Sequence, residues 1–324
     1  MRVTNSSMIR NHMYDTQQNL SRMNGIDEQL NSGKIVNRVS DDPHKAIRIM
    51  DLNNEIRYTE KYNYNIDEVV GWMETTDGSL GNLGGIFHDI KQEILEVGNG
   101  VYHEDEIKAI QSEMNEKIKD IGNILNTTYA GKYMFGGTTV DEPPVKILVD
   151  DKTGVVTLQK NPNSNSEKLK ADIADGINVK YNISTEEILT DEHLRTVNEL
   201  SATINAMLTG NKVEVDDKGN IISTKSVDKA TERENFAKLN EKLEKLTNHT
   251  LDERTSLGVK ANTATKVRDL NDDHILNMKK VRSLDQDVDY VNKFIELKSA
   301  ELVYQASIKA GSTLMQPTLL DYIR

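Results

Sequence analysis

The chain has 324 residues, a formal net charge of −12 and no cysteine. This length is enough for two or three domains with a sizeable core. The acidic balance argues against a nucleic-acid-binding protein, which would need clustered lysine and arginine on a basic domain. The lack of cysteine excludes disulfides, thiolate chemistry and cysteine-ligated zinc. Aromatic residues make up only 5% of the chain, so leucine, isoleucine, valine and methionine carry the apolar content, as they do in helical bundles.

The sequence contains no apolar run that approaches the roughly 20 residues needed to cross a membrane. Residues 1–10 are polar and lack the hydrophobic stretch of a signal peptide. We therefore expect no membrane insertion. The protein is expected either to stay in the cytoplasm or to leave the cell by a route that cleaves no signal peptide.

Apolar residues near the N-terminus recur at the three- and four-residue spacing of a coiled-coil seam. The members of this N-terminal seam are Ile9, Met13, Leu20, Met23 and Leu30, with Thr16 and Asp27 as polar positions. The pattern ends at the stop signal Asn31–Gly33. Asp42 is a suitable N-cap and Pro43 a suitable first helical residue, so a second helix is predicted to begin at Pro43.

The second helix contains a conflict between its glycines and its apolar spacing. Five glycines lie between Gly71 and Gly85, and each weakens a helix by about 1 kcal/mol relative to alanine. A regular seam nevertheless passes through them, consisting of Leu80, Leu83, Phe87, Ile90, Ile94 and Val97. We predict that the helix continues to about Val97, with room for an irregularity near Gly78. A third helix from about Glu104 is expected to pack back against it as an antiparallel hairpin.

The central part of the chain, residues 138–227, changes character at Pro143–Pro144. Short β-prone runs follow at Val145–Val149, Val155–Gln159 and Ile177–Ile183, with turn signals between them. The tract Asn161–Ser166 is predicted to be a loop and Glu186–Leu208 a helix. Val213–Val215 and Ile221–Ile222 flank a second hairpin turn. This region is therefore predicted to be a small α+β insertion.

The last quarter of the chain carries a second seam. Its apolar members are Val267, Leu270, Val281, Leu284, Val288, Val291, Ile295 and Leu302. No proline lies between Pro162 and Pro317, so one helix is expected to run through the stretch. His274, Asn277 and Lys298 interrupt the seam. Asp27, His274 and Asn277 are candidate register residues of a coiled coil, with simple solvent exposure as the alternative.

These patterns predict a mainly α protein, in which a long helical bundle or coiled coil is built from both chain ends. Residues 1–40 form an N-terminal arm that pairs with a C-terminal arm at about 285–324. Residues 41–137 form a helical rod that is completed by 228–284. Residues 138–227 form the insertion.

The sequence offers no convincing catalytic, cofactor-binding or metal-binding residues. His103–Glu104 begins like a zinc-protease motif, but Ile107 occupies the position of the second histidine. A nucleophile elbow of the G-x-S-x-G type is absent. Gly81–Gly85 lacks the Lys-Ser/Thr pair of a phosphate loop, so a weakened helix or a close helix approach is the better interpretation. Trp72 is expected to be buried.

Four motifs in order resemble the bacterial flagellin-like family. They are Leu30–Ile35, Ser40–Pro43, Asn126–Gly137 and Arg254–Asn262. Together they cover both arms and about two-thirds of the chain. The resemblance is strongest to the hook-associated branch, whose members join hook to filament. It rests on Phe135–Gly137, on the repeat-like segment Ile173–Ile183, and on the ending Leu319–Arg324, which lacks the usual flagellin finish.

The resemblance implies a structural subunit without enzymatic activity, exported by the flagellar type III route to the extracellular flagellum. Its implied partners are identical subunits in a ring, a hook-side junction protein, filament flagellin and a cytoplasmic export chaperone. The N-terminal seam residues would form an assembly interface. Val281, Leu284, Val288, Val291, Ile295 and Leu302 would form an assembly and chaperone interface. The alternatives are a filament flagellin and, less favoured, an exported enzyme with its catalytic domain at 138–227.

Overall fold

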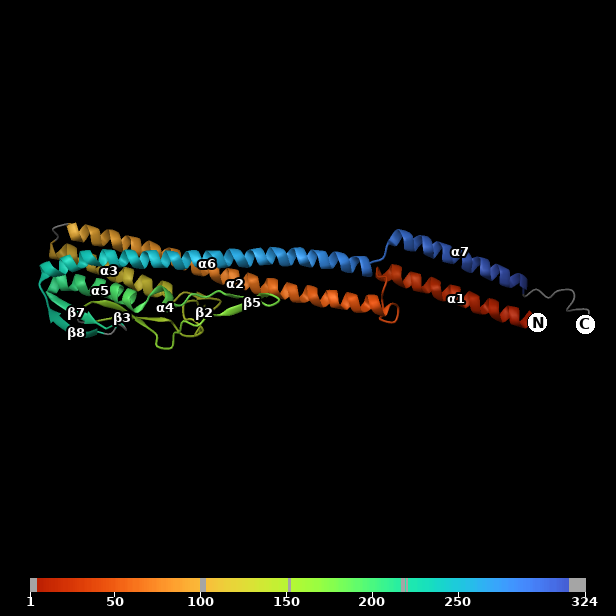
Figure 1. Ribbon diagram of the computed structural model, residues 1–324, viewed down its shortest axis with the longest axis horizontal. Helices are drawn as coiled ribbons and strands as arrows, with labels where there is room; N and C mark the ends of the chain where they lie inside the picture. Colours follow the sequence, from red (N-terminus) through yellow and green to blue (C-terminus); the bar gives the residue numbers. More distant parts are fainter. Residues whose placement is uncertain (1–4, 100–102, 151–152, 217–218, 220, 315–324) are drawn as a thin grey trace, which may run out of the picture. The chain divides into compact units, whose positions relative to one another are not determined.

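The computed structural model describes residues 5–99, 103–150, 153–216, 219 and 221–314 (Figure 1). The chain divides into two compact units, one of residues 1–60 with 272–324 and the other of residues 61–271. We call them unit 1 and unit 2. The expected domain borders at residues 40, 137, 227 and 284 differ from this division, whose borders fall inside the two longest helices, α2 (Pro43–Asn99) and α6 (Lys229–Gln286).

Unit 1 is built from two antiparallel helix pairs. Helix α1 (Asn5–Ser32) lies beside α7 (Tyr290–Leu314), as Figure 1 shows. The first turns of α2 lie beside the last turns of α6, where Ile56, Ile275 and Met278 form a small buried cluster. The prediction that both chain ends supply long paired helices is confirmed.

The segments that connect these two pairs are hydrogen-bonded to each other. The Val288 N–H donates to the Gly33 carbonyl (3.0 Å), and the Ile35 N–H donates to the Gln286 carbonyl (2.7 Å). Lys34 and Asp287 form an isolated antiparallel bridge between them. The predicted unbroken helix through 267–302 is therefore wrong, because α6 ends at Gln286 and α7 begins at Tyr290.

A polar cap explains this break without a proline. The Asp289 carboxylate accepts hydrogen bonds from the backbone N–H of Val291 (3.1 Å) and Asn292 (3.2 Å), which lack partners in the first turn of a new helix. The start of α2 uses the same device. The Lys45 N–H donates to the Asp42 carboxylate at 3.1 Å, so the predicted helix start at Pro43 is confirmed.

Unit 2 contains the main hydrophobic core. It is formed by the rest of α2, by α3 (Glu104–Leu125), α5 (Asp191–Thr209) and the first part of α6. Helix α2 is continuous through its glycines. Its predicted seam is entirely buried, at Leu80, Leu83, Phe87, Ile90, Ile94 and Val97. Gly81 is close to the Arg254 guanidinium of α6, because a Cβ there would lie 3.4 Å from Nη1. Gly81 is thus in ordinary contact with a side chain of α6, and the predicted close helix approach stays a prediction.

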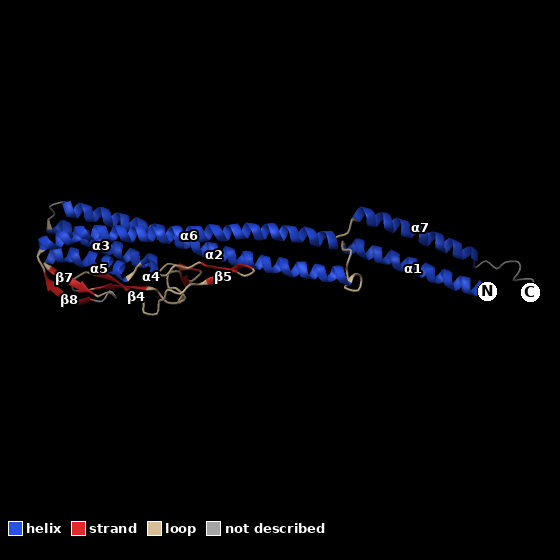
Figure 2. Cartoon of the chain, in the orientation of Figure 1, coloured by secondary structure: helices blue, strands red, loops and turns tan. Residues whose placement is uncertain are grey.

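The strands of the described part of the chain belong to unit 2 and pair as four antiparallel hairpins (Figure 2). The pairs are β1 (Thr128–Tyr129) with β2 (Lys132–Tyr133), β3 (Val145–Val149) with β4 (Val156–Lys160), β5 (Lys170–Ala174) with β6 (Ile177–Lys180), and β7 (Asn211–Val215) with β8 (Ile221–Ser226). A short helix α4 (Thr185–Ile188) precedes α5. The predicted insertion is confirmed, although β5 was not predicted. The turn signals at 151–152, 217–218 and 220, and the ending at Leu319–Arg324, lie outside the described residues.

The family-like segment Asn126–Gly137 forms a compact turn that needs its glycines. Ala130 (φ 49°) and Gly131 (φ 79°) make the tight β1–β2 connection. Gly137 has φ 74°, and a Cβ there would lie 1.9 Å from the Asn165 carbonyl oxygen. The backbone therefore approaches the 161–166 loop more closely than any side chain would permit.

Candidate assembly surface

The contact between α1 and α7 is polar and close. The His12 ring donates through Nε2 to the Ser307 carbonyl at 2.8 Å, and Asn19 Nδ2 lies 3.4 Å from Ser307 Oγ. A Cβ on Gly311 would lie 2.6 Å from His12 Nε2, so only glycine permits this approach. Small and polar residues thus make close contacts between the two arms, beside apolar residues such as Ile26 of α1 and Leu297 of α7 that are buried or partly buried.

The N-terminal seam residues lie at the edge of this contact. Ile9, Met23 and Leu30 are partly buried, whereas Met13 and Leu20 are exposed. The most buried residue of α1 is Ile26, 6% exposed, which the seam pattern missed because it placed Asp27 inward. The face of α1 that contacts α7 is therefore shifted by one residue from the predicted seam.

The C-terminal seam residues are divided between two environments. Val288 is buried in the connecting segment, and Val281 is partly buried on α6. Five members of the predicted seam point to solvent, namely Leu270 (67% exposed), Leu284 (75%), Val291 (71%), Ile295 (61%) and Leu302 (67%). A strict seven-residue repeat drifts around a straight 3.6-residue helix, which is why these residues leave the contact face.

Helix α7 consequently has an outer apolar face, which we define as Tyr290, Val291, Phe294, Ile295, Leu302 and Ile308. At 100° per residue, these six positions fall within a stripe about 140° wide. Tyr290, Phe294 and Ile308 were not predicted, because they do not fit a seven-residue repeat. A groove of about 390 Å³ adjoins this face and is lined by His12, Met13, Thr16, Gln17, Ile308, Gly311 and Ser312.

The candidate register residues are all exposed. Asp27 accepts a hydrogen bond from Asn31 on its own helix, at 3.1 Å. His274 Nε2 lies 3.1 Å from the Glu55 carboxylate at the surface, and Asn277 faces solvent. Ile275 and Met278 occupy the inward positions in their place. All three residues are exposed within this chain, and their role as register residues between subunits stays a prediction.

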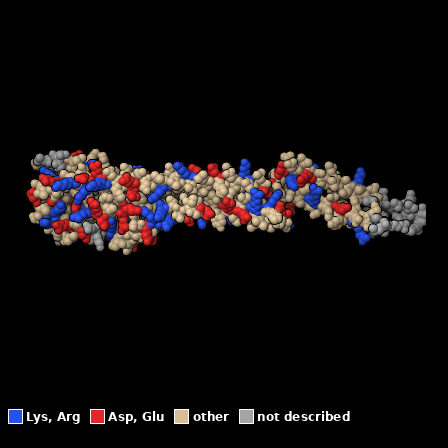
Figure 3. Space-filling model, in the orientation of Figure 1, with Lys and Arg blue, Asp and Glu red and all other residues tan. Residues whose placement is uncertain are grey.

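Charged side chains of both signs lie between uncharged areas on the face shown in Figure 3, and they are most dense at the end that contains the hairpins. The best-aligned pair joins α6 to α2 between Arg254 and Asp77, with Nε to Oδ1 at 2.7 Å. Hydrogen bonding to Asp77 raises the pKa of Arg254 further. Ion pairs of this kind fix helix register within unit 2.

A buried carboxyl lies between α2 and α3. Burial raises the pKa of Glu93 to about 7, and the Lys117 ammonium, 3.1 Å from Oε2, only partly opposes this effect. Lys117 also lies 3.0 Å from Glu113 Oε1, and this contact lowers the pKa of Glu113. Burial is therefore the main cause of the raised pKa of Glu93, and the Lys117 ammonium is shared between the two carboxyls.

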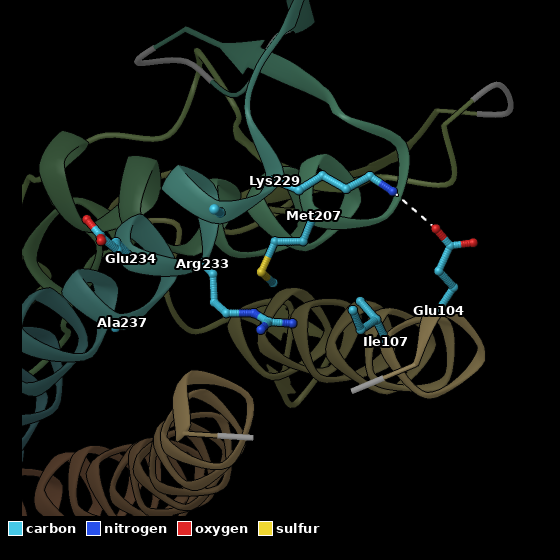
Figure 4. Close-up of a pocket in the computed structure, with 8 residues that line it drawn as sticks. Glu104, Ile107, Met207, Lys229, Arg233, Glu234 and Ala237 are labelled. Atoms are coloured by element: carbon cyan, nitrogen blue, oxygen red, sulfur yellow. Dashed lines mark hydrogen bonds and ion pairs between the residues drawn. The ribbon is translucent and has the colours of Figure 1, made fainter. Parts of the chain in front are cut away.

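A cavity of about 600 Å³ lies where α3, α5 and α6 meet (Figure 4). Lys229 Nζ lies 3.2 Å from Glu104 Oε1 across its mouth, and both side chains are largely exposed. Arg233, Met207 and Ile107 line the interior (Figure 4). This lining has no paired base and nucleophile. Among the described residues, no group of three or more His, Asp or Glu side chains could hold a metal ion.

Comparisons with known proteins agree with these features. Residues 3–139 match the bacterial flagellin N-terminal helical region. The flagellar filament 41 kDa core protein of Borreliella burgdorferi is 28% identical over 116 residues, which are 33% of this chain and 34% of that protein. The matches span about a third to a half of the length of such curated relatives.

Solved structures of flagellar proteins share the fold. A protein described as flagellar hook-associated from Vibrio parahaemolyticus has a TM-score of 0.61 at 17% identity, over 76% of this chain and 99% of that one. Flagellar hook associated protein-3 of Legionella pneumophila has a TM-score of 0.53 at 13% identity, over 73% and 99%.

Residues 3–139 of this chain match the flagellin N-terminal region, and the chain shares the fold of flagellar hook-associated structures. The match confirms the resemblance seen in the motifs within these residues. None of the described helices is long and apolar enough to cross a membrane.

Proposed function

We propose that this chain is a structural subunit of the bacterial flagellum that joins hook to filament through its terminal helices. The outer apolar face of α7 is the observation that carries this proposal. Soluble monomers rarely expose contiguous apolar patches of more than a few hundred Å². A face that includes Val291, Ile295 and Leu302 would be covered when helices of neighbouring subunits pack against it.

The partners follow from this arrangement and from the proteins that share the fold. Identical subunits would cover the outer face of α7 in a ring, with a hook-side junction protein below and filament flagellin above. Function would then lie in packing between subunits and would include no catalytic step. The place of action would be extracellular, after export by the flagellar type III route.

Before export, the same face needs protection in the cytoplasm. We propose that an export chaperone covers Val291, Ile295 and Leu302 of this face; the fourth expected contact, Val288, is buried in the connecting segment. A truncated chain that ends at Asp287 should then fail to recover the chaperone in a pull-down, whereas the full chain should recover it. Equal recovery by both chains would place the chaperone site elsewhere.

The main test is deletion of the gene in the parent bacterium. We expect intact hooks without filaments, and filament subunits released into the medium. Complementation with a Val291→Ser, Ile295→Ser, Leu302→Ser variant should fail to restore filaments. The matched control is Val259→Ser, an exposed apolar residue on α6 within unit 2. Full motility with the triple variant would contradict the proposed surface.

A filament flagellin is the second candidate, because the Borreliella burgdorferi relative is a filament core protein. The two functions differ in abundance. A filament subunit would be a major band in sheared filaments, whereas a junction subunit would be present at trace level and would stay with the hook. Quantitative mass spectrometry of sheared filaments distinguishes them.

A further inference from the structure

Three aromatic side chains of unit 2 line one small cavity. Trp72 comes from α2, Tyr129 from β1, and Tyr181 from the residue after β6. The cavity has a volume of about 160 Å³. Cavities of about 150 Å³ can accept a molecule as large as benzene. The remaining lining residues are Glu68, Val69, Ala130 and Lys132. We call this the aromatic cavity.

The rings are arranged as walls and do not stack. The Tyr129 ring lies 5.7 Å from the Trp72 ring with an angle of 65° between the planes. The Tyr181 ring lies 5.7 Å from Trp72 at 82°. Gly71 allows this arrangement, because a Cβ there would lie 2.6 Å from the Tyr129 hydroxyl. Both tyrosine rings thus make edge-on contacts with the Trp72 ring, and the three rings line the same cavity.

The chemistry of this lining favours a cation. The faces of aromatic rings carry partial negative charge, and tryptophan attracts cations most strongly. Glu68 adds a full negative charge at the rim and has no ion-pair partner among the described residues. An anion would be repelled by both features. Lys132 is exposed and adds one opposing positive charge at the rim.

Simple core packing does not account for Trp72. Its side chain is 6% exposed, and its indole Nε1 has no hydrogen-bond partner among the described residues. A buried unpaired donor is unfavourable, so packing in the core alone leaves this donor unexplained. The electron-rich indole ring is what tryptophan offers here and what leucine would lack.

We infer that the aromatic cavity binds a quaternary or alkylated ammonium group. The group would lie between the three rings, with its positive charge towards Glu68. It could belong to a free small molecule such as choline or to a methylated lysine side chain. This inference is independent of the proposed role at the hook–filament junction, because it concerns unit 2 alone and does not use the outer face of α7.

The chain reports on this site directly, because Trp72 is its only tryptophan. Choline titrated into the full-length protein should change the tryptophan fluorescence with a saturable curve. The matched control ligand is 3,3-dimethylbutan-1-ol, in which carbon replaces the choline nitrogen. We expect it to bind at least about tenfold more weakly, since it keeps the shape but lacks the charge. Equal binding, or no saturable change with any ammonium probe, would overturn the inference.

Substitutions in the cavity distinguish recognition of the ligand's charge from recognition of its shape. Glu68→Gln should weaken choline binding several-fold, and Lys132→Gln should strengthen it. Tyr181→Leu should abolish saturation, whereas Tyr58→Leu, an exposed tyrosine of unit 1, should leave it unchanged. Circular dichroism checks that each variant is folded. If neither charge variant shifts the affinity, the site does not recognise a cation.

A second comparison identifies the source of the ligand. A short peptide with one trimethyllysine is titrated beside the same peptide with unmodified lysine. Tighter binding of the trimethyllysine peptide than of choline assigns the site to a modified protein side chain. Tighter binding of choline assigns it to a free small molecule. Failure of both probes contradicts the inference and leaves the junction proposal untouched.

Discussion

Arg254 holds Asp77 through two parallel hydrogen bonds, from Nε to Oδ1 at 2.7 Å and from Nη2 to Oδ2 at 3.0 Å. The pair joins the family-like motif of α6 to the glycine-containing stretch of α2. The guanidinium also lies against Gly81, so the helix surface beneath it is bare. One side chain thus sets the register of two helices that are far apart in sequence.

Arg254→Lys should lower the free energy of unfolding by about 0.5–1 kcal/mol. Lysine keeps the charge but cannot form the two-pronged contact, and the partial exposure of both partners limits the loss. Urea denaturation measures the change. Arg268→Lys is the matched control, because Arg268 makes a single exposed contact to Asp67 at 3.1 Å and should matter less. Equal losses in both variants would contradict the special role of Arg254.

Gly137→Ala should destabilise unit 2 by about 3–5 kcal/mol, because it combines a left-handed backbone with a clash against Asn165. Gly131→Ala provides the comparison. Gly131 has a similar φ of 79° but open space around it, so only the backbone strain of about 1–2 kcal/mol applies. Guanidinium denaturation of both variants tests the difference. A Gly137 variant as stable as the Gly131 variant would show that the 161–166 loop yields easily.

Glu93 should make the protein less stable as pH rises from about 4.5 to about 7. Its folded pKa of about 7 lies above the ordinary value of 4.5 for a glutamate, so the folded state binds more protons in this window. The stabilisation is complete below pH 4.5 and is lost as pH rises through 7. Glu93→Gln should remove this slope and gain on the order of 1–3 kcal/mol at pH 8. An unchanged slope in thermal melts across pH would refute the prediction.

His193 should give the stability of the protein the opposite kind of pH dependence, with a loss at acid pH. Burial lowers its pKa, and the neighbouring His249 ring, 5.1 Å away, adds to the effect. A lowered folded pKa gives stability that is present above the unfolded value of about 6.5 and is lost as pH falls through the folded value. His193→Gln should therefore flatten the loss of stability on the acid side. His88→Gln on the exposed face of α2 is the control, and an equal effect there would exclude the role of burial.

The long helices were predictable, because their signals are local. Asp42 and Pro43 mark the start of α2, and the seam from Leu80 to Val97 outweighs the glycines within it. The central hairpins also follow from turn residues. Strand β5 was missed because Lys170–Ala174 contains only one β-branched residue and carries two charges.

The faces of the arms were harder to predict. Spacing identified the apolar residues but could not tell which of them meet within one chain. In α7 the inward positions include Ser307 and Gly311, which no hydrophobic pattern selects. The break at 287–289 escaped as well, since it depends on hydrogen bonds to Gly33 and Ile35, residues more than 250 positions away. Contacts between segments far apart in the sequence therefore influence both the inward face of α7 and the break at 287–289.

The hydrogen-bonded connectors in unit 1 have a mechanical consequence. Gly33 and Val288 are tied together, and so are Ile35 and Gln286. Neither connector can bend or twist by itself without breaking these bonds, so α1 and α7 must swivel as one body. A torque applied to α1 or α7 is then shared by the two connecting segments, which resist it together.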